Sequence, residues 1–146
     1  MRNWRGWGLI LLLVAGEAAA EPVQIGTTFS TRQCLYLQVN AKKTLKEILK
    51  AKFDLIRLSA YWDDLEPREG VYDFSSLDWQ IAQAKSRQIP VVLTLGMKAP
   101  RWPEYFIPPW ALKHLQLRKG ADVSQHAYLR LRTLLFLQTV MRRYQH

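Results

Sequence analysis

Residues 91–95, Val91-Val92-Leu93-Thr94-Leu95, form a nearly uninterrupted apolar run that follows Pro90 and ends before Gly96. Such a run is typical of a strand that is buried on both faces of a parallel sheet. Two earlier segments, 23–29 and 55–59, are rich in β-branched or aliphatic residues. We therefore predict three strands, one in each of these segments.

Helices are predicted between and after the strands. Thr44 with Glu47, and Ser75 with Asp78, have the spacing of a capping box, in which Ser or Thr is followed three residues later by an acidic side chain. Ser124 is the expected N-cap of a last helix. Its expected buried stripe consists of Ala127, Leu131, Leu134, Leu135 and Met141.

The alternation of strands and helices indicates an α/β fold with parallel strands and helical crossovers. The predicted strands start near positions 23, 54 and 91, which are 31 and 37 residues apart. A complete (β/α)8 TIM barrel uses about 250 residues, or about 31 for each unit. The predicted fold class is a partial (β/α)8 TIM barrel made of its first three β/α units. A doubly wound open sheet has the same element order, but its usual G-x-G-x-x-G loop is absent from the sequence.

The N-terminus has the organisation of a secretory signal peptide. Arg2 and Arg5 precede the apolar run 9–15, and Ala18-Ala19-Ala20 resembles a cleavage site. We expect residues 1–20 to be the signal peptide, 21–146 to be the incomplete barrel, and the product to be secreted or periplasmic. An uncleaved anchor is the alternative, although the run is shorter than the ~20 residues that span a bilayer. No stable membrane insertion is expected after cleavage.

The composition limits which kinds of binding site and binding partner are expected. Cys34 is the only cysteine, so an intrachain disulfide is impossible, and the three histidines lack metal-ligand spacing. We predict no metal and no cofactor. The net charge is +9, with many basic residues in the last predicted helix. Because these alternate with apolar residues, we expect a solvated helix face and no nucleic-acid partner. Binding of that helix to a membrane surface stays open.

The loop after the second predicted strand contains Glu66-Pro67-Arg68-Glu69-Gly70-Val71-Tyr72-Asp73-Phe74, which leads to Leu77-Asp78. With Arg57 in the strand and Trp62 after it, this pattern resembles clan A glycoside hydrolases. The stretch 96–103 is also similar to that clan, and the resemblance runs from about residue 23 to residue 145. It implies a (β/α)8 fold and the activity of a retaining enzyme that cleaves β-linked sugars.

The resemblance assigns roles to three residues. Arg57 matches the clan arginine that hydrogen-bonds the catalytic nucleophile; a local partner, Asp54 or Asp63, is the alternative from burial alone. Trp62 and Trp102 are candidate sugar-contacting residues, because aromatic faces suit the C–H faces of sugars, or else they pack the loops onto the barrel rim. The other aromatic residues of these loops are expected to be structural: Tyr105, Phe106 and Trp110.

The resemblance provides no catalytic residues. The clan has catalytic glutamates after the fourth and seventh strands, the first of them in an Asn-Glu pair, whereas Asn3 and Asn40 here are not followed by Glu. His146 lies at the end of the third predicted helix, before a fourth strand. The loop carboxylates Asp63, Asp64, Glu66 and Glu69 cannot flank a sugar from opposite sides. Asp63 and Asp64 are expected to be turn or capping groups, and Glu69 is expected to be a solvated charge.

The predicted function is therefore that of a glycoside hydrolase-like protein that acts on β-linked carbohydrate by resemblance, truncated before both catalytic glutamates and inactive alone. The alternative is a non-catalytic carbohydrate-binding or assembly module, completed by a second chain that supplies the other part of the barrel. In either case we expect the third strand to form an unpaired, apolar edge of the sheet.

Overall fold

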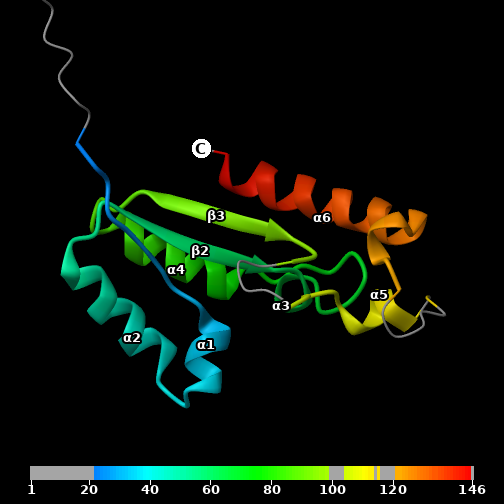
Figure 1. Ribbon diagram of the computed structural model, residues 1–146, viewed down its shortest axis with the longest axis horizontal. Coiled ribbons are helices and arrows are strands. Elements are labelled where there is room, and N and C mark those ends of the chain that lie inside the picture. The colour runs from blue at the N-terminus through cyan, green and yellow to red at the C-terminus, as the bar shows by residue number, and fades with distance from the viewer. Residues whose placement is uncertain (1–21, 99–103, 114, 116–120, 146) are drawn as a thin grey trace, which may run out of the picture.

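The computed structural model describes residues 22–98, 104–113, 115 and 121–145 (Figure 1). Three strands and six α-helices occur in the described residues, with two short 3-10 turns, η1 (Leu49–Ala51) and η2 (Val123–Gln125). The strands are β1 (Gly26–Thr28), β2 (Leu55–Tyr61) and β3 (Val91–Gly96). The helices are α1 (Thr31–Tyr36), α2 (Ala41–Ile48), α3 (Trp62–Leu65), α4 (Ser75–Lys85), α5 (Pro109–Lys113) and α6 (Ala127–Tyr144).

The three strands form one parallel sheet in the order β1-β2-β3. Each pair is joined through a helical connection, with α1 and α2 between β1 and β2, and α3 and α4 between β2 and β3. This arrangement confirms the predicted α/β fold with parallel strands. β3 lies at an edge of the sheet within the described residues, as expected.

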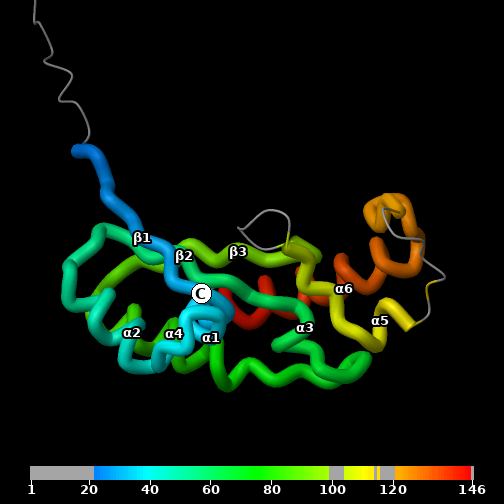
Figure 2. Tube along the Cα trace, turned by 60° about the horizontal axis from the view of Figure 1, so that its bottom comes forward, coloured from blue at the N-terminus to red at the C-terminus, as the bar shows by residue number. Residues whose placement is uncertain are grey.

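The two faces of the sheet differ in chemistry. Ile56 and Leu58 are fully buried in the apolar core that α2, α4 and α6 share. In Figure 1, α6 runs alongside β3, across the strands from α2 and α4 in that view, and Figure 2 shows α2 and α4 below the strands. The alternate residues point to the other face. There Arg57 is paired in register with Val92, which is 47% exposed. The polar face therefore corresponds to the interior side of a barrel.

Two of the predicted helix starts are wrong in their capping residues. α2 begins at Ala41, three residues before Thr44, because the side chain of Asn40 accepts a hydrogen bond from the backbone N–H of Lys43 (2.9 Å). α4 does begin at Ser75, but its N-cap residue is Phe74, which makes no side-chain capping bond, and Asp73 Oδ1 accepts from the N–H of Ser75 (2.9 Å). Several residue types can cap a helix, and local spacing does not decide between neighbouring candidates.

The prediction for the last helix is wrong in its start and in its buried face. α6 begins at Ala127, and Ser124 lies in η2, where Asp122 accepts hydrogen bonds from its backbone and side chain. The buried stripe is Leu129, Thr133, Phe136 and Val140. The predicted stripe is mostly exposed: Leu131, Leu134, Leu135 and Met141. α6 has apolar residues on two faces, so periodicity alone did not identify the one that meets the sheet.

Ion pairs fasten α6 to the rest of the fold, although its basic residues were expected to be solvated. Arg143 donates to both carboxylate oxygens of Asp78 at the start of α4, at 2.9 and 2.5 Å. The hydroxyl of Tyr144 donates to the same carboxylate at 2.7 Å. Arg132, whose side chain is only 14% exposed, is paired with Glu66. No helix in the described part of the chain is long and apolar enough to cross a membrane.

The contact of Asp78 with α6 predicts a pH dependence of stability. The hydrogen bond from Arg143 holds the pKa of Asp78 below its ordinary value of 3.8. A depressed carboxyl pKa stabilises the fold above the unfolded-state pKa, and that contribution is lost as the pH falls through the folded-state value. We expect the free energy of unfolding of the wild type to fall more steeply between about pH 5 and pH 2.5 than that of Asp78→Asn.

Urea denaturation at each pH measures this difference. Arg143→Leu is the matched variant, because it removes the main partner of Asp78 and should flatten the pH profile in the same way. Equal slopes in the wild type and both variants would show that the contact does not couple protonation to folding.

Candidate sugar-binding face

The functional face is expected at the carboxyl ends of the strands, because barrel enzymes build their sites from the loops that follow each strand. Ser30 and Arg32 follow β1, and Tyr61 and Asp63 lie at the end of β2. The hydroxyls of Ser30 and Tyr61 are 2.7 Å apart. Arg32 pairs with Asp63 at 2.9 Å, and its guanidinium lies 5.6 Å from the centre of the Tyr61 ring. These contacts bring the first two loops together.

Arg32 also pairs with Asp64, so both adjacent carboxylates of α3 share one guanidinium. Burial raises the pKa of Asp64, and the positive charge of Arg32 opposes that rise. The two aspartates lie side by side on one short helix. They therefore hold the loop after β1 against the loop after β2, and they do not face each other across a space that a sugar ring could occupy.

Glu66 is the centre of a buried polar network. Its side chain is 0% exposed and accepts from the indole Nε1 of Trp62 (2.6 Å), the backbone N–H of Gly70 (2.8 Å) and Arg132 of α6 (2.5 Å). Its own carbonyl accepts from Trp110 Nε1 at 2.7 Å. The contacts with Trp62 and Gly70 lie within the segment after β2, whereas those with Arg132 and Trp110 join this segment to α6 and α5. Glu66 is thus engaged in structure, and Glu69 beside it is half-exposed, with its carboxylate 3.5 Å from Arg132.

Trp62, a candidate for sugar contact, is 0% exposed. Its ring is stacked on Phe136 of α6 at 5.6 Å between centroids and meets Trp110 edge-on at 6.1 Å. A fully buried ring has no free face for a sugar. Of the two roles considered for Trp62, loop packing is the one that agrees with its position. Trp102, the other candidate, lies outside the described residues, and its role stays a prediction.

Arg57 points to the polar face of the sheet, where its Nε donates to Thr28 Oγ1 at 3.1 Å. Neither local carboxylate considered from the sequence is its partner. Asp63 is paired with Arg32, and Asp54 accepts from the backbone N–H of Ile25 at 2.7 Å. The next polar pair on this face is Ser59 with Thr94, at 3.1 Å. The role of Arg57 toward a catalytic nucleophile therefore stays a prediction.

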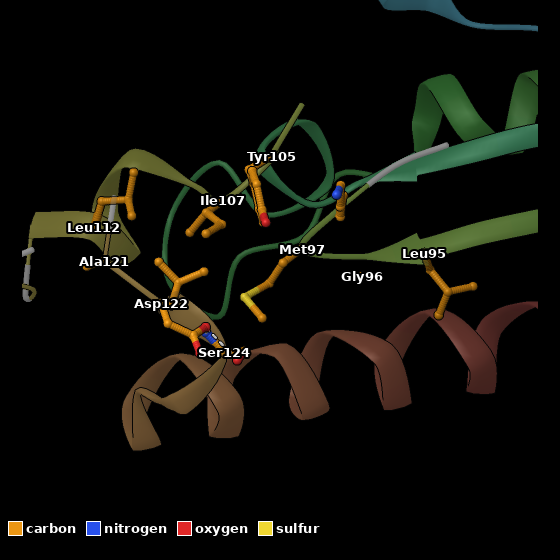
Figure 3. A pocket seen from close by; sticks show the side chains of 11 residues that line it. Leu95, Gly96, Met97, Tyr105, Ile107, Leu112, Ala121, Asp122 and Ser124 are labelled. Carbon is orange, nitrogen blue, oxygen red and sulfur yellow. Dashed lines mark hydrogen bonds between the residues drawn. The ribbon is translucent and has the colours of Figure 1, made fainter. Parts of the chain in front are cut away.

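A cavity of about 770 Å³ lies beyond the end of β3 (Figure 3). Its walls come from four places: the end of β3 and its loop, the segment that contains Tyr105 and Ile107, α5, and the turn before α6. Most of the lining is apolar: Leu95, Gly96, Met97, Ile107, Leu112, Ala121 and Val123. Lys98, Tyr105, Asp122 and Ser124 add polar groups.

The segment 105–107 separates this cavity from the polar cluster that Arg32 forms with Asp63 and Asp64. Tyr105 and Ile107 line the cavity, whereas Phe106 between them is buried with its ring 4.5 Å from that of Tyr61. The backbone of Phe106 holds the segment in place, since its N–H donates to Met97 O at 2.8 Å and its carbonyl accepts from the N–H of Asp63 at 3.2 Å. The polar cluster and the apolar cavity are therefore neighbours.

Sequence reasoning missed Arg32, Arg132 and the cavity. The (i, i+4) spacing of Trp62 and Glu66 was a signal that the two could meet. No comparable signal joins Glu66 to Arg132, which is 66 residues away. Phe106 and Trp110 pack as expected, but Tyr105 is 55% exposed and lines the cavity, with Lys98 Nζ 5.3 Å from the centre of its ring.

The fold has a match among solved structures. The exo-beta-1,4-mannosidase of Opitutaceae bacterium strain TAV5 aligns with a TM-score of 0.56 and 18% sequence identity, over 82% of this chain and 22% of that enzyme. At this identity the match shows the fold alone, that of the N-terminal part of a (β/α)8 barrel. No curated protein matches the chain significantly.

The sequence profile of the Glyco_hydro_42 family, described as beta-galactosidase, matches residues 37–144. That span includes β2, β3, the loop with Glu66 and the whole of α6. The resemblance to clan A glycoside hydrolases is thereby confirmed. Because the match covers most of its length, the chain belongs to the Glyco_hydro_42 family of glycoside hydrolases.

Proposed function

We propose that this chain forms three β/α units of a glycoside hydrolase barrel that binds β-linked carbohydrate, and that its loop carboxylates maintain structure and do not cleave the glycosidic bond. The proposal rests on the pairing and burial of those carboxylates. Asp63 and Asp64 share Arg32, and Glu66 is completely buried in its network. A retaining mechanism needs two carboxylates about 5 Å apart on opposite sides of the scissile bond.

Carbohydrate binding is supported by family membership and by the position of the polar groups. Asp63 and Asp64 keep part of their surface exposed at the carboxyl end of β2 and can accept hydrogen bonds from sugar hydroxyls. Arg57 lies on the barrel-interior face without a carboxylate partner in the described residues. In our proposal it orients the nucleophilic glutamate of the complete barrel, as the clan resemblance implies.

The chain spans 22% of the matched mannosidase, so the activity of a complete enzyme is part of the proposal. The second candidate function is a non-catalytic carbohydrate-binding or assembly module. The exposed apolar residues of α6 and the edge position of β3 favour a partner that supplies the neighbouring part of the barrel.

We expect the 146-residue chain to show no turnover of aryl β-galactosides and to bind methyl β-D-galactopyranoside weakly. A sensitive chromogenic assay measures the first property and isothermal titration calorimetry the second. Hydrolysis that disappears in both Asp63→Asn and Asp64→Asn would contradict the structural role of these groups. Co-expression with the remaining β/α units of a related barrel distinguishes the two functions. Gained hydrolysis indicates an enzyme part, whereas unchanged binding without hydrolysis indicates a module.

We also propose export, on the strength of the basic, apolar and Ala-rich order of residues 2–20. Cleavage after Ala20 would release a chain that begins at Glu21. N-terminal sequencing of the protein from the periplasm or medium tests this directly. Replacing Leu12 with Arg should keep the chain in the cytoplasm, because a charge interrupts the apolar run, and soluble protein that retains Met1 would contradict the proposal.

A further inference from the structure

A second cavity, of about 530 Å³, lies where the chain enters β2 and β3. Its lining residues belong to two segments: 49–54, which precedes β2, and 87–89, which precedes β3. The backbone N–H of Ile56 donates to the carbonyl of Pro90 at 2.9 Å, so the two segments lie side by side. Because the strands are parallel, this cavity is at the opposite end of the sheet from the candidate sugar-binding face (Figure 1).

The lining of this second cavity combines apolar and cationic side chains. Leu49 is 3% exposed, and Phe53 and Ile89 are half-buried, so these three form an apolar wall. A cleft lined mainly by one sign of charge attracts ligands of the opposite sign. The charged lining residues are all exposed, and basic ones outnumber the acidic one: Lys50, Lys52, Arg87 and Asp54.

Two of these cations have no counter-ion within the described residues. Lys50 Nζ is paired with the carboxylate of Glu47 at 2.8 Å, and Asp54 accepts from a backbone N–H at 2.7 Å. Lys52 and Arg87 make no ion pair and no side-chain hydrogen bond in the part of the chain that the structure describes. The cavity therefore offers two unpaired positive charges to a ligand.

The charges at this end of the sheet act on the neighbouring carboxylate of Glu47. Its pKa lies below the ordinary value of 4.5, first because of the hydrogen bond from Lys50 and also because of the charges of Lys50, Lys43 and Arg87. Arg87 thus contributes to a positive potential that reaches beyond its own turn. An anion in the cavity experiences the same attraction.

Lys52 has a backbone conformation that suits glycine better than lysine. Its φ is 54°, and Gln88, in the corresponding turn before β3, has a φ of 57°. Glycine adopts such angles without the cost that a Cβ brings. A change of either residue to glycine is therefore compatible with its turn, so the Lys52 cation can be removed without disturbing the backbone.

The chemistry of the two unpaired cations favours a doubly charged oxyanion. The guanidinium of Arg87 can donate two parallel hydrogen bonds to a phosphate, and the ammonium of Lys52 adds a second positive charge. A phosphate monoester carries a charge of about −1.5 to −2 at pH 7, which matches two cations, whereas a carboxylate carries only one negative charge. The apolar wall suits the organic part of such an ester.

We propose that this second cavity binds a phosphate monoester, with the phosphate between Lys52 and Arg87 and the organic group against the apolar wall. The site is separate from the proposed carbohydrate function, because its lining residues lie at the other end of the strands. Either inference can therefore fail without the other.

Calorimetry on the full 146-residue chain at neutral pH and low ionic strength tests the proposal with three probes. Phenyl phosphate tests the whole site, inorganic phosphate tests the cations alone, and benzyl alcohol tests the apolar wall alone. We expect phenyl phosphate to bind most tightly. Its affinity should fall as NaCl is added, since salt screens exposed charges.

Lys52→Gly and Arg87→Gln should each weaken the binding of phenyl phosphate about tenfold, because each removes one of the two cations. Gln88→Gly is the matched control, since it makes the same backbone change at the same cavity without removing a charge. Arg130→Gln removes an exposed cation of α6, outside the cavity, and controls for net charge. Both controls should leave the affinity unchanged, and circular dichroism verifies that all variants fold.

The proposal is overturned if the wild type does not bind phenyl phosphate, or if Arg87→Gln and Arg130→Gln weaken binding equally, which indicates a response to net charge alone. The alternative role for Arg87 is to stabilise the C-terminus of α4, where the helix dipole favours cations. In that case Arg87→Gln lowers the free energy of unfolding and leaves the affinity for phenyl phosphate unchanged, which also overturns the proposal. Inorganic phosphate that binds as tightly as phenyl phosphate contradicts the role given to the apolar wall.

Discussion

Glu66→Ala is expected to lower the free energy of unfolding by about 3–5 kcal/mol, because it removes one partner of a buried ion pair. The change leaves the guanidinium of Arg132, the indole N–H of Trp62 and the backbone N–H of Gly70 without their shared acceptor. Urea denaturation followed by circular dichroism measures the loss. Arg132→Met is expected to destabilise by a similar amount, since it leaves the buried carboxylate without its cation.

The neighbouring carboxylate is the matched control. Glu69→Ala should cost less than about 1 kcal/mol, because Glu69 is 48% exposed and its contact with Arg132 is long. The double variant Glu66→Ala with Arg132→Met should cost less than the two single changes together, since the two residues act on each other. Additive effects would show that Glu66 and Arg132 stabilise the fold independently.

Trp62→Ala is expected to cost about 3–5 kcal/mol, the range for removal of a large buried aromatic side chain. The substitution opens a cavity beside Phe136 and Trp110 and deprives Glu66 of a donor. Trp62→Phe should cost less, because it keeps a ring against Phe136 and loses only the indole hydrogen bond and part of the volume. Thermal and urea unfolding measure both changes.

This series also decides between the two roles considered for Trp62. If Trp62 is a packing residue, Trp62→Phe lowers the free energy of unfolding. The folded fraction of this variant then binds methyl galactoside as the wild type does. Tyr36→Ala, at a 79% exposed position, is the control and should change stability by less than about 0.5 kcal/mol. Unchanged stability of Trp62→Phe with lost sugar binding would instead identify Trp62 as a sugar-contacting residue.

Local patterns in the sequence were sufficient for the strands and their order. The apolar run at Val91–Gly96 and the alternation of strand and helix predicted a parallel sheet, although β3 lies at the sheet edge and none of its residues is fully buried. The Glu66–Phe74 motif identified the clan, and the family profile agrees with it. β1, at Gly26–Thr28, is shorter than the predicted segment 23–29.

Competing local signals explain the errors at helix ends and faces. Asn40, Thr44 and Ser124 are all good capping residues, and only the path of the chain decides which of them meets a free N–H. In α6, Leu131 and Leu134 are as apolar as Leu129, yet Leu129 is the one that packs into the core. A helix with two apolar faces acquires its orientation from the surface on which it packs.

The sequence by itself determined the fold class, the family and the absence of an Asn-Glu pair, because each depends on residues close together along the chain. Only the tertiary structure decided what the loop residues do. Glu66 becomes a buried structural carboxylate because Arg132, 66 positions later, is placed against it by α6. The cavity beyond β3 likewise exists because segments far apart in sequence converge at one end of a strand. Long-range packing sets burial and partners, and these determine whether a carboxylate or an aromatic ring holds the fold together or contacts a ligand.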